Sequence, residues 1–273
     1  MNYSDWLISH AAQIRLAAFL LVIITLFGLQ KRWPRRAVPG GWRRITTNFT
    51  LVGIDTAILR VAFPLLAVDL ALQVAESGGG LMRNWPPVAA IIAGMVLLDF
   101  IIYWQHRLFH AVPLFWRLHR VHHTDTGFDL SSGVRFHPLE IALSMILKLA
   151  TILIFGINPL AVLLFEILLS VGSLFTHANL SIPALLQRPL SWLIVTPDMH
   201  RIHHSWHRDE TDSNFGFNLS IWDRVFGSYR DQPRDGHVDM TIGLTEFREP
   251  KCQSLWALLL NPFRSADRNS PPG

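Results

Sequence analysis

The chain has little cysteine and little charge, and each shortage excludes a class of protein. A single cysteine among 273 residues rules out a disulfide framework and any cysteine-based zinc or iron–sulfur site. Charged residues make up 16% of the chain, against about 25% in typical soluble domains. Half of the residues are hydrophobic and the mean hydropathy is +0.29, which argues against a soluble globule and against intrinsic disorder. No cleavable signal peptide, large internal repeat, glycine-rich phosphate loop or Ser-His-Asp constellation is evident.

Long apolar stretches indicate an integral membrane protein. Five of them approach the roughly 20 residues that a membrane-spanning helix needs: 12–30, 47–74, 86–105, 140–156 and 159–176. The second is interrupted by Asp55, Arg60 and Asp69, so it either spans the bilayer or re-enters it. We therefore predict an all-α bundle of about four to five transmembrane helices.

Basic residues orient this bundle. The loop between the first two stretches holds six of them: Lys31, Arg32, Arg35, Arg36, Arg43 and Arg44. The positive-inside rule then places this loop in the cytoplasm and the N-terminus outside. Segments 106–138 and 177–273 follow on the cytoplasmic side. Trp33 and Trp42 make the loop an interfacial anchor rather than a nucleic-acid site.

The last two stretches are predicted to form a hairpin, because Gly156, Asn158 and Pro159 interrupt the helix between them. Lys148 and Glu166 each lie nine residues from Ile157, near the middle of the bilayer. Charges at that depth are costly unless they are partnered. We therefore predict an ion pair between them; the alternative is that each faces a wet cavity separately.

Histidines carry the chemistry. There are 13 of them, and eight fall in three clusters, HRLFH, HRVHH and HRIHH, at His106, His110, His119, His122, His123, His200, His203 and His204. Residues three and four apart share a helix face, so each cluster can aim its imidazoles at one point. Imidazole suits iron, zinc, copper and nickel. Eight ligands are too many for one zinc ion, and we predict two metal ions held mainly by histidine.

Further ligands can be ranked by position. His177 follows the fifth apolar stretch on the predicted cytoplasmic side and is the best additional candidate. His137, in RFHPLE, is either a ligand or a donor to one. His207 is a weaker candidate, and we expect His10 and His237 to lie at the surface.

A histidine ligand usually donates its second ring N–H to a carboxylate or carbonyl. Asp99, Glu140 and Asn179 are our candidates for such supporting roles at the catalytic site. Asp99 is favoured because an acidic side chain deep in an apolar stretch is energetically costly unless it has a function. Asp125, Asp198 and Asp223 also lie near the clusters, although Asp198 could instead cap a helix and Glu140 could favour a helix N-terminus.

These motifs resemble those of the fatty acid hydroxylase/sterol desaturase superfamily, and the sterol desaturase-like branch in particular. The matching text covers about residues 90–230 and includes D-x6-HRLFH, LFWRLHRVHHT, RFHPLE, HAN, TPDMHRIHHS, NFG and WDRVFGSY. Two features of other members are missing. Ser181 stands where the sphingolipid branch has a further histidine, and VPGG at 38–41 lacks the haem-binding histidine of a cytochrome b5-like domain.

The resemblance implies an N-terminal transmembrane region at 1–89, a catalytic domain at 90–230 and a cytosolic tail at 231–273. It also implies a cytosolic helical cap that holds two iron ions, with the eight cluster histidines and His177 as ligands. Zinc can occupy such a site on purification. O2 is then the co-substrate, the substrate is a lipid in the bilayer, and electrons come from a separate cytochrome b5, ferredoxin or reductase. The host membrane is a bacterial inner membrane or the endoplasmic reticulum.

The predicted function is O2-dependent hydroxylation or desaturation of a C–H bond in a sterol, fatty acyl or related membrane lipid. Carotenoid hydroxylation or ketolation and ether-lipid monooxygenation remain alternatives on the same centre. A non-catalytic metal-handling protein is an alternative of another class. A transporter would place its ligands within the spans, and zinc hydrolysis needs fewer ligands and a carboxylate base, so both fit the sequence less well.

Overall fold

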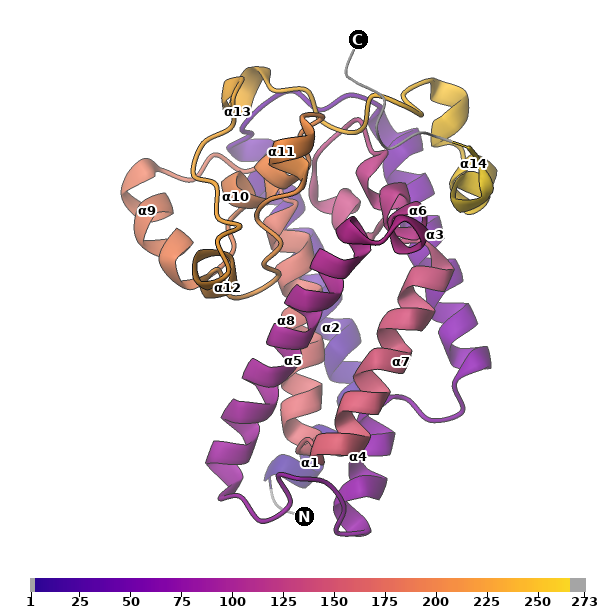
Figure 1. Cartoon of the computed structure of the whole chain (residues 1–273), viewed down its shortest axis with the longest axis vertical. Helices are drawn as coiled ribbons and strands as arrows, with labels where there is room; N and C mark the ends of the chain where they lie inside the picture. Colours follow the sequence, from indigo (N-terminus) through magenta and orange to yellow (C-terminus); the bar gives the residue numbers. More distant parts are fainter. Residues whose placement is uncertain (1–2, 266–273) are drawn as a thin grey trace.

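The computed structural model describes residues 3–265, and these residues form helices without any β-strand. Long helices stand side by side in a bundle, and short helices and loops gather in a cap at one end of it (Figure 1). The N-terminus lies at the end of the bundle opposite the cap (Figure 1). The all-α prediction is therefore confirmed.

Six long helices build the bundle, preceded by the short α1 (Tyr3–Ser9). They are α2 (Ala11–Arg32), α3 (Gly41–Ala62), α4 (Ala67–Glu76), α5 (Pro87–Ala111), α7 (Pro138–Phe155) and α8 (Pro159–Thr176). Taking α3 and α4 together, five segments are long and apolar enough to cross a membrane. Their places agree with the five predicted stretches.

The second predicted stretch crosses the bundle as two helices. It is interrupted after Ala62, where Phe63 takes an extended conformation with φ −120° and ψ 104°. Pro64 follows, and a proline disfavours helical geometry in the residue before it. Beyond the break, α4 packs against both α7 and α8 at the end remote from the cap. The stretch therefore runs the length of the bundle.

Prolines mark where many of the helices begin. Proline occupies the first turn of α5, α6 (Pro113–His123), α7, α8 and α10 (Pro197–His203), where its missing N–H leaves no helical bond unmade. Gly156 ends α7 in the left-handed conformation, with φ 65°. A Cβ on it would lie 2.6 Å from the Gly79 carbonyl oxygen, so only glycine allows the 77–86 loop to pack against the α7–α8 turn.

The predicted intramembrane ion pair is confirmed. Lys148 Nζ lies 2.8 Å from Glu166 Oε1, and both side chains are about 10% exposed. The structure adds a third member, because Arg15 of α2 also pairs with Glu166. One carboxylate thus connects α2, α7 and α8.

The cap is assembled around α6 from short elements. These are η1 (Leu130–Val134), α9 (Ala184–Leu193), α10, α11 (Arg208–Thr211), α12 (Ile221–Val225), α13 (Gly236–Asp239), η2 (Pro250–Gln253), α14 (Leu255–Leu260) and η3 (Asn261–Phe263). With so little regular structure, buried side chains connect the parts. Arg44 of α3 pairs with Asp125 and Asp129, and Arg120 donates to Asn261 near the C-terminus. The last eight residues of the predicted tail lie outside the described part.

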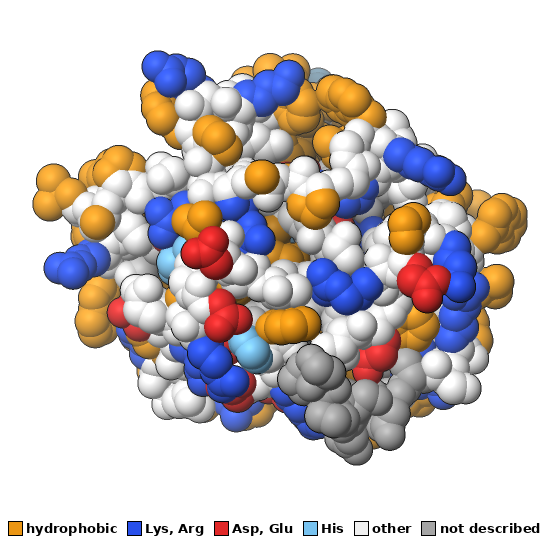
Figure 2. Space-filling view, turned by 90° about the horizontal axis from the view of Figure 1, so that it is seen from above, with side chains coloured by type: hydrophobic (Ala, Val, Ile, Leu, Met, Phe, Trp, Pro, Cys, Tyr) orange, Lys and Arg blue, Asp and Glu red, His pale blue; other side chains and the backbone are white. Residues whose placement is uncertain are grey.

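Seen from above, the outer face of the cap mixes basic, acidic and apolar side chains, and little histidine reaches the surface (Figure 2). The clustered histidines are instead all buried beneath this face, between cap and bundle.

Candidate metal centre

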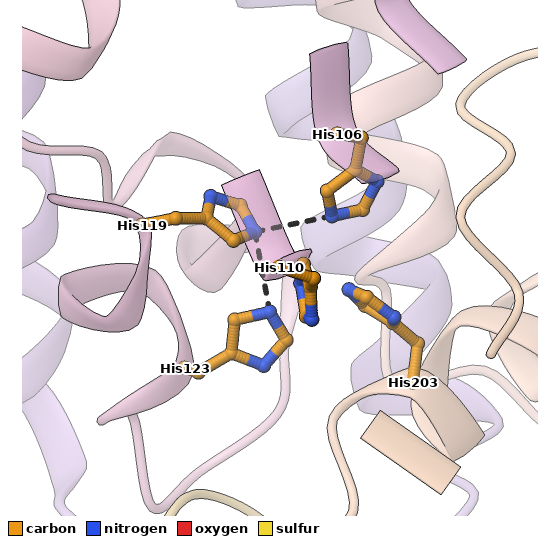
Figure 3. A group of neighbouring side chains, drawn as sticks. All are labelled: His106, His110, His119, His123 and His203. Atoms are coloured by element: carbon orange, nitrogen blue, oxygen red, sulfur yellow. Dashed lines mark hydrogen bonds between the residues drawn. The ribbon is translucent and has the colours of Figure 1, made fainter. Parts of the chain in front are cut away.

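Nine buried histidines form two groups in which the facing ring nitrogens lie within 4.8 Å of one another. The first group has five members, His106, His110, His119, His123 and His203 (Figure 3). The second has four, His122, His177, His200 and His204. These nine are the eight cluster histidines and His177.

Three helices supply the first group, and their rings converge on one point (Figure 3). His106 and His110 are one turn apart on α5, and His119 and His123 are one turn apart on α6. His203 approaches from α10. In the second group, His177 directly follows α8 of the bundle, whereas His122 and His200 lie on α6 and α10. Both groups therefore join the bundle to the cap.

Each H-x-x-H-H cluster is divided between the groups, which corrects the expectation that it aims at one point. On α6, His119 and His123 belong to the first group and His122 to the second. In the α10 motif, His200 and His204 belong to the second group and His203 belongs to the first. Adjacent residues on a helix point about 100° apart. The consecutive histidines in each motif therefore diverge, and each helix bridges the two groups.

Hydrogen bonds at Nδ1 orient six of the nine rings. The acceptors in the first group are the Phe215 carbonyl for His106, Glu140 for His119, Asp212 for His110 and the Ser213 carbonyl for His203. In the second group they are the Ser173 carbonyl for His177 and the Arg135 carbonyl for His122. A neutral ring that donates through Nδ1 presents an unprotonated Nε2. These rings are thus held in the form that binds a metal.

In one pair of rings from each group, the two Nε2 atoms face each other at a distance that hydrogen bonding does not explain. His177 Nε2 lies 3.1 Å from His122 Nε2, and His106 Nε2 lies 3.1 Å from His119 Nε2. All four rings use Nδ1 as the donor, so each pair sets two lone pairs against each other. His203 Nε2 has no hydrogen-bond partner among the described residues and is buried. A metal ion about 2.1 Å from each of two nitrogens would hold them about 3.0–3.4 Å apart.

Burial keeps the rings neutral. It lowers the pKa of His177 to about 4. It also lowers the pKa of His122, His123, His200, His203 and His204 well below the ordinary value, with neighbouring imidazoles adding to the effect. Neutral imidazoles are ligands, whereas protonated ones are not. The donor set thus fits a pair of metal ions that favour nitrogen ligands.

Glu140 contacts a ring of the first group, whereas Asp99 and Asn179 make their hydrogen bonds to other residues. Glu140 Oε1 accepts from His119 Nδ1 at 2.6 Å. Asp99 instead accepts from Asn218, Trp222 and the Leu219 backbone, which anchors α5 to the cap.

Asn179 is bound to the 33–40 loop. Its Oδ1 accepts from the Arg36 N–H at 3.2 Å, and its Nδ2 donates to the Arg36 carbonyl at 2.7 Å. It therefore holds the loop between α2 and α3 against the segment that follows His177.

His137 lies outside both groups. Its Nδ1 accepts from the Leu139 N–H and caps α7, and its Nε2 donates to the Leu259 carbonyl at 3.1 Å. Both nitrogens are thus used by the backbone. His207 is also outside and pairs with Asp235. The expectation for His237 was wrong, because it is buried near Asp198.

Sequence reasoning missed the carbonyls of Ser213 and Phe215, which orient His203 and His106. Asp223 holds this loop by accepting from the N–H groups of Phe215 and Gly216, both at 2.8 Å. A Cβ on Gly216 would lie 2.7 Å from Asp223 Oδ2. The NFG and WD motifs were the available signal, and their role is to place two backbone acceptors.

A cavity of about 260 Å³ lies within the bundle and reaches the first group. It is lined by residues of α2, α3, α5, α7 and α8, and His106 and His119 stand at its cap end. Its walls are mainly apolar, with side chains such as Phe19, Leu59 and Leu169. A lipid chain in the bundle could therefore reach this histidine group from the apolar interior.

The chain is similar in sequence to one protein family and to several known proteins. Residues 91–228 match the model of the fatty acid hydroxylase family. An ornithine lipid hydroxylase, OlsE, from Rhizobium tropici is 32% identical over 84% of this chain and 68% of its own length. Human alkylglycerol monooxygenase is 30% identical over 89% of this chain and 55% of its own length.

Human lathosterol oxidase is 27% identical over 52% of this chain and 46% of its own length. The chain thus spans only about half the length of both human relatives. No solved structure matches.

Proposed function

Because the chain belongs to the fatty acid hydroxylase family, we propose that it oxidises a C–H bond of a membrane lipid at a histidine-ligated di-iron centre. The observation that carries the proposal is the pair of histidine groups, which contain five and four residues, together with the cavity that leads from the bundle to the first group. O2 is the co-substrate. With two electrons and two protons from a separate donor, the products are an alcohol and one water or, where a second hydrogen is lost instead, an alkene and two waters.

The proposed ligands are the nine grouped histidines, and His137 is left out because the backbone uses both of its nitrogens. Iron bound there would supply O2 activation. The chain's own residues do the rest. Glu140, the Phe215 carbonyl and the Ser213 carbonyl hold the rings of three ligands, and the apolar cavity wall positions the substrate and excludes water.

The relatives support a lipid substrate, since they are a lipid hydroxylase, an alkylglycerol monooxygenase and a sterol oxidase by name. Ether-lipid monooxygenation is the second candidate, favoured by the match to alkylglycerol monooxygenase over 89% of the chain. We place the cap and both histidine groups on the cytoplasmic side, because the basic 31–44 loop lies at that end of the bundle. A separate protein would deliver electrons there.

The test is a comparison of lipid extracts by mass spectrometry from cells that contain varied lipids and a competent reductase. Wild type is compared with the double variant His122→Ala/His123→Ala, which removes one histidine from each group. His207→Ala is the matched control, since this histidine belongs to neither group. We expect a lipid with one added oxygen or two fewer hydrogens in the wild type and the control only.

Equal amounts of the three proteins in the membrane fraction make the comparison valid. Identical lipid profiles in all three strains would contradict oxidation and favour metal handling.

A further inference from the structure

An acidic side chain in the membrane-spanning part of α3 has no described partner. Asp55 is 4% exposed, and no hydrogen bond or ion pair reaches it among residues 3–265. A buried polar group normally has a partner, and an ionisable residue at membrane depth is costly unless it has a function. Asp55 therefore stands apart from Glu166, which has two cationic partners.

Asp55 lines the same cavity that reaches the first histidine group. Two other oxygen acceptors in the cavity wall are also buried without a described partner, Gln105 Oε1 and Glu140 Oε2. The second polar atom of each of these two side chains has a hydrogen-bond partner. Gln105 Nε2 donates to Ser144 Oγ at 2.5 Å, and Glu140 Oε1 accepts from His119 at 2.6 Å. Their free oxygens are consequently fixed acceptors.

Three unpartnered acceptors in one apolar cavity call for a ligand that donates hydrogen bonds. An alkyl chain alone would leave all three unsatisfied, at a cost of about 1–3 kcal/mol for each buried group. The cavity, at about 260 Å³, is smaller than the roughly 300–1,000 Å³ of pockets that enclose a drug-sized ligand. It therefore takes one end of a lipid rather than the whole molecule.

Resting on the lipid oxidation proposed above, we propose that Asp55, with Gln105 and Glu140, forms a subsite for a hydrogen-bond-donating group of the substrate, a hydroxyl or an ammonium. His106 and His119 line the same cavity, so the bound group sets which neighbouring carbon faces the metal site. Asp55 is thereby a specificity-determining residue.

The experiment measures binding without turnover. Metal-loaded protein in lipid nanodiscs is titrated with decanol, decylamine and methyl decyl ether, and the apparent affinity is taken from the rise in melting temperature. The ether has the chain but no donor. We expect at least one of the two donors to bind the wild type about tenfold more tightly than the ether, the size of one hydrogen bond to a charged group. The better donor distinguishes a hydroxyl site from an ammonium site.

Substitutions locate the effect. Asp55→Leu should bring both donors to the affinity of the ether. Asp55→Asn, which keeps an acceptor oxygen of the same shape, should retain any preference for decanol and lose any preference for decylamine. Asp69→Leu is the matched control, because Asp69 is an exposed acid of the same membrane stretch and does not line the cavity. It should leave the wild-type preference unchanged.

Equal binding of all three probes to the wild type, or a donor preference that survives in Asp55→Leu, would overturn the subsite. Neither result depends on catalysis. Lipid oxidation without a donor preference would leave the proposed function standing and show the subsite to be wrong. A donor preference without lipid oxidation would leave the binding subsite standing and show the proposed function to be wrong.

Discussion

Single residues decide which nitrogen each imidazole presents. Glu140 is the clearest case, since its carboxylate receives the Nδ1 proton of His119 and so directs Nε2 to the first group. The backbone carbonyls of Ser213 and Phe215 do the same for His203 and His106. The sequence separation between acceptor and histidine ranges from 10 residues for Ser213 and His203 to 109 for Phe215 and His106. The sequence could rank Glu140 as a candidate, but it could not assign it to His119.

At this scale we predict that Glu140→Leu lowers metal affinity about 10- to 100-fold, the usual effect of losing a group that holds a ligand. Glu140→Gln should fall between this variant and the wild type, because its amide oxygen can still accept from His119. Metal content after dialysis against graded chelator is the measurement. Equal metal retention in all three proteins would mean that the His119 contact does not orient the ring.

Helices and loops act as units at the next scale. The α10 and α6 motifs each bridge the two histidine groups, and Asp223 of α12 fixes the loop that orients His203 and His106.

We predict that Asp223→Ala lowers bound metal and leaves helix content nearly unchanged, because it frees a loop rather than a helix. Metal analysis and circular dichroism check this together; full metal content would refute the role of the loop.

The three-way ion pair within the bundle also belongs to this scale. Glu166→Gln should destabilise by about 3–5 kcal/mol, since it leaves Lys148 and Arg15 as buried or partly buried cations without their carboxylate. Lys148→Met should cost less, because Arg15 still pairs with Glu166. Thermal unfolding in detergent, with Lys31→Met as the control, measures both. Equal losses from the two variants would argue that Arg15 contributes nothing.

At the scale of the whole molecule, both histidine groups join the bundle to the cap, so a metal ion bound in either group would connect the two parts. A ligand at about 1,000 times its dissociation constant adds about 4 kcal/mol. We therefore predict that metal removal lowers the melting temperature of the wild type by about 10 °C. The loaded protein should contain two metal ions per chain by elemental analysis. A single ion, or an unchanged melting temperature after chelation, would contradict a two-metal centre.

The sequence by itself determined the composition of the fold and of the site. Apolar runs bounded by proline and glycine specify helices of membrane-spanning length, since these signals are local. The spacing of the clusters identified eight of the nine grouped histidines, and position alone suggested His177. Lys148 and Glu166 could be paired because they are equally distant from one turn.

Only the tertiary structure decided what depends on distant segments meeting. It divided each H-x-x-H-H motif between two groups, excluded His137 from both, and placed Asp99 against Trp222 rather than beside a ligand. It also brought Asp55 of α3 into the cavity beside His106 and His119. The physical reason is the same in each case: helical periodicity specifies a direction for a side chain, whereas packing of the bundle against the cap determines what lies in that direction.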